Sequence, residues 1–244
     1  MRVVAIVQAR MGSTRLPGKV LREVLGKPLL EWQVERLRLA SRLDCIMVAT
    51  STNPADGAIE AYCRSAGISC YRGSESDVLD RYRAAARACD ATWVVRVTGD
   101  CPLIDPRTVD HLVELFRGSA YDYASTDLER TYPLGMDAEI VSADLLDTAW
   151  REAVDPVERE HVTPFFYLRP NRFRLGNLRC DRVIDGTHRW TVDTAEDFEL
   201  IRRLLTELQP RHPGFSLDDV LKVLSDNPSW LEINASVRQK TLGE

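Results

Sequence analysis

The chain has no surplus of positive charge and no long hydrophobic run. Its 244 residues include 32 Lys and Arg against 37 Asp and Glu, a formal net charge of −5 at pH 7. A general nucleic-acid binder shows a basic patch or stripe, and this charge balance argues against one. A charged leader followed by an apolar segment, or an apolar stretch long enough for a bilayer, is also missing. We therefore expect a cytoplasmic protein without a membrane or nucleic-acid partner.

Cysteine spacings typical of metal sites are missing as well. Six cysteines show no Cys-x-x-Cys spacing and no zinc-type spacing with the histidines; they stand at positions 45, 63, 70, 89, 101 and 180. Most lie in apolar runs, where a free Cys behaves as a small buried hydrophobic residue, as is usual in a reducing compartment. Repeats, low-complexity segments and Gly/Ser linkers are absent. We therefore expect residues 1–244 to form a single domain.

The two common phosphate-binding loops are also absent. An apolar run at 3–7 leads into Gln-Ala-Arg-Met-Gly-Ser-Thr-Arg-Leu-Pro-Gly-Lys at 8–19. A Walker A loop has four residues between its glycines and a hydroxyl residue after its lysine. Here five residues separate Gly12 from Gly18, and a valine follows the lysine. The Gly-x-Gly-x-x-Gly fingerprint of dinucleotide sites is missing too, so this is a third kind of loop.

The loop nevertheless has the residue types that a polyphosphate requires. Gly12 and Gly18 allow the backbone to approach a ligand closely and to turn its N–H groups inward. Arg10, Arg15 and Lys19 supply positive charge, and an arginine can grip two phosphate oxygens at once. The alternative interpretation is a basic surface turn after a first strand. Because the charge is local in an acidic chain, a small anionic ligand suits it better.

This loop resembles the signature of the sugar-acid cytidylyltransferases, the family of CMP-KDO synthetase and CMP-sialic acid synthetase. Within that family the likeness is greatest to the type of the spore-coat polysaccharide biosynthesis protein F (SpsF). It continues through Thr-Gly-Asp-Cys-Pro-Leu-Ile-Asp at 98–105, Glu-Arg-Glu-His-Val-Thr-Pro at 158–164 and Thr-Val-Asp-Thr at 191–194. The resemblance implies a Rossmann-like, GT-A-like nucleotidyltransferase fold of three layers, a CTP substrate, Mg²⁺ as cofactor and a homodimer.

The hydrophobic pattern by itself also predicts an α/β fold with a mostly parallel, doubly wound sheet. We expect strands at 3–7, 45–50, 69–71 and 93–97, and helices from Pro28, from Asn53 to about Gly67, and at 77–89. Beyond residue 120 we expect strands at 121–125, 138–141, 172–178 and 188–192, and helices at 142–150, from Thr194 and from Ser216. We interpret about 120–180 as a small inserted region that covers the active site and makes the dimer contact.

Two aspartates are candidate ligands of a metal ion. Asp100 follows the strand at 93–97, and Asp193 follows the segment at 188–192. Ligands of open parallel sheets bind at the carboxyl ends of the strands, so both should reach the edge that carries the phosphate loop. Mg²⁺ prefers one or two carboxylates together with phosphate oxygens and water. Both positions also match the family's metal-binding aspartates. The alternative interpretations are that Asp100 only forms a turn before Pro102 and that Asp193 is only a neighbour of a helix cap.

The resemblance implies nucleotidyl transfer, in which an acceptor oxygen attacks the α-phosphorus of CTP and pyrophosphate leaves. The catalytic residues would be Arg10, Arg15, Lys19 and Asp100. The residues expected to bind the nucleotide are Gln8, Ala9, Arg10, Gly12, Ser13, Arg15, Lys19, Arg72, Gly73, Ser74, Asp77, Arg81, Thr98 and Gly99. In the segment 72–81 the acidic and basic residues could equally form exposed ion pairs along a helix.

The stretches 132–139 and 158–161 resemble the family's sugar-binding segments. The residues expected to bind the acceptor are Tyr132, Asp137, Glu139, Glu160, His161 and Arg189. A sugar pocket needs hydrogen-bonding groups for hydroxyls and a cation for a carboxylate or phosphate, which His161 and Arg189 would supply. His161 could equally be structural, and we assign His111, His188 and His212 to the surface or the core. Core packing is the default for Trp32, Trp93, Trp150 and Trp190.

The leading hypothesis is a CTP-dependent cytidylyltransferase that activates a sugar or sugar acid for surface polysaccharide biosynthesis. Transfer to a sugar phosphate or a phosphonate remains open, because the loop and the aspartates do not distinguish these acceptors. A glycosyltransferase that uses a nucleotide sugar is a second alternative, but its frequent Asp-x-Asp motif is absent from the sequence. A nucleotide-binding subunit without catalysis is a third, and the intact set of Arg15, Lys19, Asp100 and Asp193 speaks against it.

Overall fold

A computed structural model describes residues 1–184 and 188–239 of the chain. Within these ranges the strands of the main sheet are β1 (Val3–Gln8), β4 (Cys45–Ser51), β5 (Cys70–Gly73), β6 (Trp93–Thr98), β7 (Tyr123–Ser125), β8 (Glu139–Ser142) and β9 (Leu175–Asn177). Their order across the sheet is β5-β4-β1-β6-β8-β7-β9. Only β8 among them runs against the others, because its pairings with β6 and β7 are antiparallel. The prediction of a mostly parallel sheet is confirmed.

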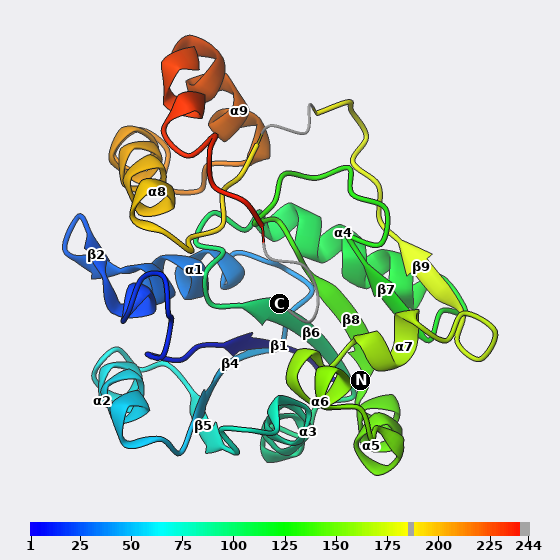
Figure 1. Cartoon of the computed structure of the whole chain (residues 1–244). Coiled ribbons are helices and arrows are strands. Elements are labelled where there is room, and N and C mark those ends of the chain that lie inside the picture. Colours follow the sequence, from blue (N-terminus) through cyan, green and yellow to red (C-terminus); the bar gives the residue numbers. More distant parts are fainter. Residues whose placement is uncertain (185–187, 240–244) are drawn as a thin grey trace.

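Helices cover both faces of this sheet, which gives three layers (Figure 1). One face packs against α1 (Leu29–Leu37), α2 (Gly57–Ser65) and α4 (Pro106–Arg117). The other packs against α3 (Val78–Ala88), α5 (Ala143–Glu152), α6 (Pro156–His161) and α7 (Pro164–Tyr167). Successive side chains of a strand point to opposite faces, so the unbroken apolar run of β1 supplies both layers.

A third cluster of buried side chains lies beside the sheet. It is built around α8 (Ala195–Leu208) and α9 (Leu217–Asp226), with Trp190 among its fully buried members. The small elements η1 (Lys19–Leu21), β2 (Glu23–Val24), β3 (Lys27–Pro28), η2 (Pro54–Asp56) and η3 (Pro228–Glu232) complete the fold. Figure 1 shows α8 between α9 and the β2 hairpin, at the edge of the molecule. Through this cluster the chain returns to the neighbourhood of the phosphate loop.

Most predicted elements are confirmed to within a few residues. The Ser142 side chain caps α5 as expected, since its hydroxyl accepts a hydrogen bond from the backbone N–H of Leu145 (3.2 Å). Thr194 and Asp197 form a capping box at the start of α8. Gly67 has a left-handed φ of 62° after α2. Pro28 precedes α1 and does not begin it. The four named tryptophans belong to the packed clusters, as expected.

The predicted strand at 188–192 is wrong. An isolated β-bridge joins Arg189 to Leu134, and the backbone bonds of the segment go to loops. Trp190 N–H donates to the Leu134 carbonyl (2.7 Å) and Val192 N–H to the Asp100 carbonyl (2.8 Å). No neighbouring strand therefore pairs with it within the described ranges. The strand expected at 172–178 is shorter and is limited to β9, while α4, α6 and α7 were not predicted. Residues of about 120–180 contribute β7, β8 and β9 to the main sheet and α5 to α7 to one face.

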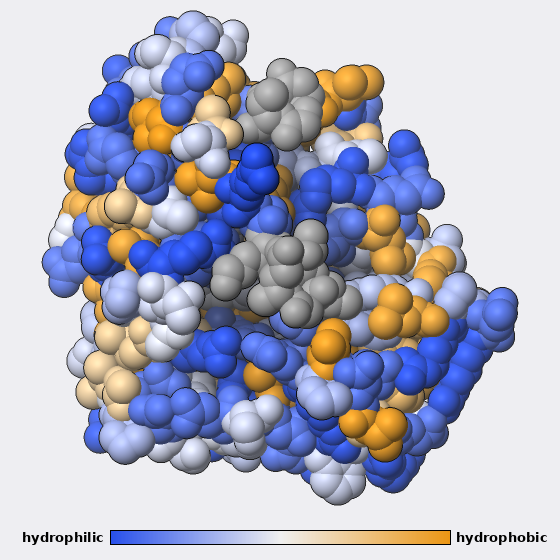
Figure 2. Space-filling model, in the orientation of Figure 1, coloured by the Kyte–Doolittle hydropathy of each residue, from blue (hydrophilic) through white to orange (hydrophobic). Residues whose placement is uncertain are grey.

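Exposed large hydrophobic residues of the described ranges are distributed singly over the surface. None of the helices in the described part of the chain is both long enough and apolar enough to cross a bilayer. In Figure 2 hydrophobic residues are scattered among hydrophilic ones on the face in view. The large hydrophobic residues that are exposed come from separate segments: Met1, Leu25, Leu39, Val154, Leu168 and Val183. Single residues of this kind are normal on a protein surface.

Candidate active site

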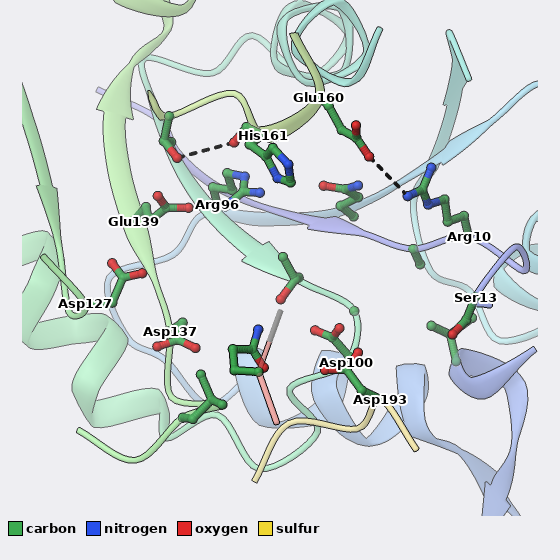
Figure 3. Close-up of a pocket in the computed structure, with 18 of the residues that line it drawn as sticks. Arg10, Ser13, Arg96, Asp100, Asp127, Asp137, Glu139, Glu160, His161 and Asp193 are labelled. Carbon is green, nitrogen blue, oxygen red and sulfur yellow. Dashed lines mark hydrogen bonds and ion pairs between the residues drawn. The ribbon is translucent and has the colours of Figure 1, made fainter. Parts of the chain in front are cut away.

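A cavity of about 870 Å³ opens at the carboxyl ends of β1 and β6. In Figure 3, Arg10 and Ser13 lie at one end of it and Asp127 and Glu139 at the other, with Asp100 between them. The first end belongs to the loop after β1, and the second to β8 and the loops around it. This is the edge at which open α/β sheets bind their ligands. Its volume is within the range of about 300–1,000 Å³ that is usual for ligand pockets.

The phosphate loop is folded back on itself after β1. Ser13 N–H and Gly18 N–H both donate to the Met11 carbonyl, at 2.9 and 3.0 Å. Gly18 has a left-handed φ of 67°, which a residue with a Cβ rarely adopts. Met11 N–H in turn donates to Oδ1 of the buried Asp56 (2.7 Å), a contact that the sequence did not predict. Gly12 lines the cavity, and the space where its Cβ would stand is open.

Lys19 lies between the two aspartates. Its ammonium donates to Oδ2 of Asp100 (2.8 Å), to Oδ1 of Asp193 (2.9 Å) and to the carbonyl of Val192 (2.6 Å). The side chain is only 11% exposed. Burial by itself lowers the pKa of Lys19, but the two carboxylates outweigh burial and raise the pKa above its ordinary value. The lysine is therefore charged and holds both carboxylates at one point.

Gly99 explains how Asp100 comes so close to the phosphate loop. The Gly99 N–H donates to the Gln8 carbonyl (2.7 Å), and a Cβ at position 99 would stand 2.7 Å from that same oxygen. Only glycine lets the ends of β1 and β6 approach in this way. Burial raises the pKa of the Asp100 carboxyl, but Lys19 more than compensates and the net pKa is lowered. Asp100 is thus ionised at neutral pH.

The Asp193 carboxylate is held at both of its oxygens. Oδ1 accepts from Lys19, while Oδ2 lies 3.0 Å from Nη2 of Arg15 and 2.8 Å from Nη2 of Arg189. The segment before it is fixed by the bond from Val192 N–H to the Asp100 carbonyl. Although the expected strand is absent, these contacts bring Asp193 to the predicted place. Asp100 and Asp193 lie next to each other in Figure 3.

The opposite end of the cavity carries ion pairs that the sequence did not predict. Arg96 on β6 pairs with Glu139 on β8, and the hydroxyl of Tyr123 donates to the same carboxylate (2.6 Å). Arg130 Nη1 donates to Asp137 (2.6 Å). A signal for Arg96 was available, because a charged residue within a buried valine-rich strand requires a partner. The sequence offers no comparable signal for Arg130, which lies in a loop.

Carboxylates outnumber their partners at this end. Burial, with Glu139 and Asp137 nearby, raises the pKa of Asp127 from 3.8 to about 6. Burial also raises the pKa of Asp137, although Arg130 acts in the opposite direction. The nearest cationic atom to the Asp127 carboxylate in the described part of the chain belongs to Arg130, at 3.9 Å. This end therefore presents acceptors for hydroxyl groups beside two guanidinium groups.

The short helix α6 brings Glu160 and His161 to the cavity wall. Its start is capped by Asp155, which accepts from the Val157 N–H (2.8 Å). Glu160 lies 3.8 Å from Arg10 across the cavity mouth, as the dashed line in Figure 3 marks. Burial lowers the pKa of His161, despite the opposing effect of Glu160. A neutral imidazole at this place can both accept and donate a hydrogen bond.

The structure brings many of the predicted site residues together around one cavity. From the nucleotide set, the cavity is lined by Gln8, Ala9, Arg10, Gly12, Ser13, Arg15, Lys19, Thr98 and Gly99. From the acceptor set, it is lined by Asp137, Glu139, Glu160 and His161. Both expected metal ligands line it as well. Other residues of the wall were not predicted: Thr14, Val20, Arg96, Tyr123, Asp127, Leu128, Arg130, Leu134, Thr163, Tyr167 and Gln239.

The segment 72–81 lies away from this wall. Arg72 donates from Nε to the Ser51 carbonyl (2.9 Å) and from Nη2 to the Asn53 carbonyl (2.8 Å), so it fixes the turn after β4. Arg81 is fully buried and donates to the Ser74 carbonyl. Gly73 gives this arginine its space, since a Cβ there would stand 3.0 Å from the Arg81 Cγ. A nucleotide contact of these residues stays a prediction.

The remaining members of this segment and of the acceptor set have structural contacts. Asp77 caps α3 by accepting from the Asp80 N–H (2.9 Å). Tyr132 is buried in the cluster around α8. Arg189 lies behind Asp193 and not on the cavity wall as the structure describes it. A direct contact of Arg189 with an acceptor is therefore not supported by its position.

A doubly wound sheet whose first loop presents cations to two aspartates is the arrangement of a nucleotidyltransferase. The comparison with protein families agrees, because the cytidylyltransferase family model matches residues 4–222. The chain belongs to this family and is a cytidylyltransferase of the CMP-KDO synthetase and SpsF type. This assignment decides against the glycosyltransferase alternative.

Individual relatives support the assignment. The chain is 36% identical over 234 residues to the spore coat polysaccharide biosynthesis protein SpsF of Bacillus subtilis, covering 93% of this chain and 95% of that protein. It is 31% identical over 240 residues to the 3-deoxy-manno-octulosonate cytidylyltransferase of an Anaeromyxobacter species, covering 84% and 97%. A solved structure of a cytidylyltransferase from Leptospira borgpetersenii superposes with a TM-score of 0.90 at 32% identity, covering 99% of each chain.

Proposed function

We propose that this enzyme transfers the cytidylyl group of CTP to an oxygen of a sugar or sugar acid, for surface polysaccharide biosynthesis. The products are a CMP-sugar and pyrophosphate. The observation that carries the proposal is the convergence of Asp100 and Asp193 on Lys19 at the phosphate-loop end of the cavity. The relatives' names support the acceptor class, since one acts on 3-deoxy-manno-octulosonate and another is a spore coat polysaccharide biosynthesis protein.

The phosphate-loop end suits the triphosphate of CTP. Arg10, Arg15 and Lys19 line the cavity there beside the glycine-containing turn. Their charges would neutralise the β- and γ-phosphates and stabilise the pyrophosphate as it leaves. Little covalent chemistry falls to the protein in such a reaction, so position and charge dominate. The folded loop, anchored by Asp56, keeps the cations in place before the substrate binds.

Asp100 and Asp193 fit a magnesium ion. Oδ2 of Asp100 and Oδ1 of Asp193 both bond the Lys19 ammonium, so the two carboxylates lie close enough to share one cation. A bound Mg²⁺ would take the place of that ammonium, and Lys19 would turn to the phosphates. Within residues 1–184 and 188–239 there is no group of three or more His, Cys, Asp or Glu side chains that would cage a metal. Two carboxylates completed by phosphate oxygens and water are the ligands that Mg²⁺ prefers. When bound, Mg²⁺ would withdraw charge from the triphosphate.

The acceptor would lie at the other end of the cavity. Asp127, Asp137 and Glu139 offer carboxylate oxygens to its hydroxyl groups, and Arg96 offers a cation nearby to an acidic group. His161, neutral because burial lowers its pKa, can hydrogen-bond a further hydroxyl. In the reaction the acceptor hydroxyl would give its proton to a carboxylate of this end of the cavity or to water. Its oxygen bonds to the α-phosphorus, and the bond from that phosphorus to pyrophosphate breaks. The phosphate-loop end would hold CTP and the opposite end the acceptor, so that the reacting atoms meet between them.

A pyrophosphate-release assay tests the proposal. The purified enzyme is incubated with CTP, MgCl₂ and each member of a panel of sugar acids, sugar phosphates and phosphonates. We expect release with CTP and one class of sugar acid or related sugar, and a CMP-sugar product by mass spectrometry. Release only with sugar phosphates or phosphonates would correct the acceptor class. If no member of the panel led to pyrophosphate release and CTP stayed intact, the proposal would be contradicted.

A further inference from the structure

Arg189 lies directly behind one of the two cavity aspartates. Its side chain is only 7% exposed. The Nη2 atom donates to Oδ2 of Asp193 (2.8 Å), and it also donates to Oδ2 of Asp197 (3.1 Å). The Nε atom donates to Oδ1 of Asp197 (2.9 Å). The planar guanidinium therefore bridges a cavity carboxylate and a buried one.

Asp197 fixes the backbone at the same place. Its side chain has no exposed surface, and its Oδ2 accepts from the backbone N–H groups of Asp193 (2.9 Å) and Thr194 (3.1 Å). Arg189 and Asp197 together thus hold both the side chain and the backbone of Asp193. With Nε and Nη2 of Arg189, these backbone groups supply four of the five hydrogen bonds that the buried carboxylate accepts. Such a carboxylate allows little displacement of the groups that it binds.

The C-terminal segment completes this network. Asn234, which is 3% exposed, donates from Nδ2 to Oδ1 of Asp197 (2.8 Å) and to the Arg189 carbonyl (3.0 Å). Gln239 lines the cavity, and its Oε1 accepts from Nη1 of Arg189 (2.6 Å). Asn234 and Gln239, near the end of the described chain, therefore both contact Arg189. We call Arg189, Asp197 and Asn234 the Asp193 support.

We infer that Arg189 is a positioning residue, which sets the Asp193 carboxylate for the metal-bound triphosphate. This inference rests on the proposed function. Because Oδ2 of Asp193 is bound by Arg189 and Arg15, Oδ1 faces Lys19 and the position shared with Asp100. Without Arg189, Oδ2 keeps only the contact with Arg15, whose side chain is 29% exposed, so the direction of Oδ1 is fixed less firmly. Groups that orient a ligand in this way are about as important for metal sites as the ligands themselves.

Stability alone is a weak reason for such a network. A buried ion pair pays a desolvation cost that its attraction often only balances, and apolar residues of similar volume are frequently as stable. The Asp193 support lies where the orientation of a side chain affects ligand binding, since Asp193, which it holds, lines the cavity. Lysine cannot replace Arg189, because a single ammonium lacks the planar fork that reaches Asp193 and Asp197 together.

Isothermal titration calorimetry of the Arg189→Lys variant with CTP and MgCl₂ tests the inference. The matched control is Arg36→Lys, since Arg36 is 2% exposed and donates to the carbonyls of Ile104 (2.8 Å) and Phe215 (3.0 Å), away from the cavity. We expect Arg189→Lys to weaken Mg·CTP binding about 10–100-fold, the range usual for a residue that orients a metal ligand. Metal-free CTP should be weakened less. Arg36→Lys should lower the thermal midpoint and leave the Mg·CTP affinity unchanged.

The outcomes separate this inference from the function on which it rests. If the unchanged enzyme does not bind Mg·CTP, the proposed function fails. If it binds and Arg189→Lys binds equally well, the positioning role is overturned. Should circular dichroism show Arg189→Lys to be unfolded, Asn234→Leu serves instead, because it removes the donors to Asp197 and the Arg189 carbonyl at similar volume. A weaker Mg·CTP affinity in Asn234→Leu supports the role, and an unchanged affinity contradicts it.

Discussion

Lys19 and Asp100, 81 positions apart in the chain, are joined by a hydrogen bond of 2.8 Å from ammonium to carboxylate. The parallel pairing of β1 with β6 makes this contact possible, since Gln8 and Thr98 are register partners at the ends of the two strands. Both residues then follow their strands to the same edge of the sheet. The bond couples the cations of the phosphate loop to the carboxylates of the expected metal site.

Replacement of Lys19 by methionine should remove most of the activity. The change keeps the unbranched side chain but leaves Asp100 and Asp193 without the cation between them. We expect kcat for pyrophosphate release to fall about 10²–10³-fold, as when one preorganised charge-stabilising group is lost. The control is Lys222→Met, an exposed lysine paired with Asp226 on α9, which should retain full activity. If the two variants had the same kcat, Lys19 would have no role in catalysis.

Asp100→Asn and Asp193→Asn should each nearly abolish turnover while the fold is kept. An amide is a poorer ligand for Mg²⁺ than a carboxylate, and each change removes a charge partner of Lys19. Pyrophosphate release over a MgCl₂ titration measures the effect, and circular dichroism checks the fold. Retained Mg²⁺-dependent activity in either variant would exclude that residue from the metal site.

Gly99→Ala should destabilise the protein by about 1–3 kcal/mol, the usual cost of forcing an extra group into a packed site. Its Cβ would stand 2.7 Å from the Gln8 carbonyl oxygen, so the ends of β1 and β6 must separate. Gly214→Ala is the control, because the space around Gly214 is open. Urea unfolding at 25 °C measures both variants. If Gly99→Ala had the same free energy of unfolding as the unchanged protein, the strand ends would separate without an energetic cost.

Asp127 should make stability depend on mildly acidic pH. Its pKa is raised from 3.8 to about 6 in the folded protein, chiefly by burial. Between about pH 4 and 6 the folded state therefore binds this proton more strongly than the unfolded state, and stability falls as pH rises through the window. Asp127→Asn should remove that slope and be the more stable protein at pH 7. Urea unfolding at several pH values measures this, and identical slopes would contradict it.

The parts of the fold that local sequence determines were predictable. The apolar run of β1, the glycine-containing loop after it and the Ser142 cap are local patterns, and each is confirmed. The convergence of Asp100 with the loop follows from one general rule for parallel sheets. Helix α4 could also have been predicted from sequence, since Asp105 caps it and Pro106 begins it.

The acceptor end was less predictable because long-range pairing creates it. Arg96 meets Glu139 only because β8 runs antiparallel to β6, and no local pattern states that register. Arg189 matched the expected chemistry of a cation for the acceptor, yet its guanidinium lies behind the cavity wall, where it bonds Asp193 and Asp197. Arg81, which the sequence could place in an exposed helical ion pair, is fully buried. A residue type predicts chemistry, whereas its direction depends on the packing of distant segments.

The most direct test of the central claim is thermal unfolding of the enzyme with each nucleoside triphosphate, with and without MgCl₂. It needs no knowledge of the acceptor. A ligand at a hundred times its dissociation constant stabilises the folded state by about 2.7 kcal/mol, which gives a clear shift in midpoint. We predict that CTP with Mg²⁺ produces this shift and that ATP, GTP and UTP produce much less. A larger shift with UDP- or GDP-sugars, and none with CTP, would contradict the account.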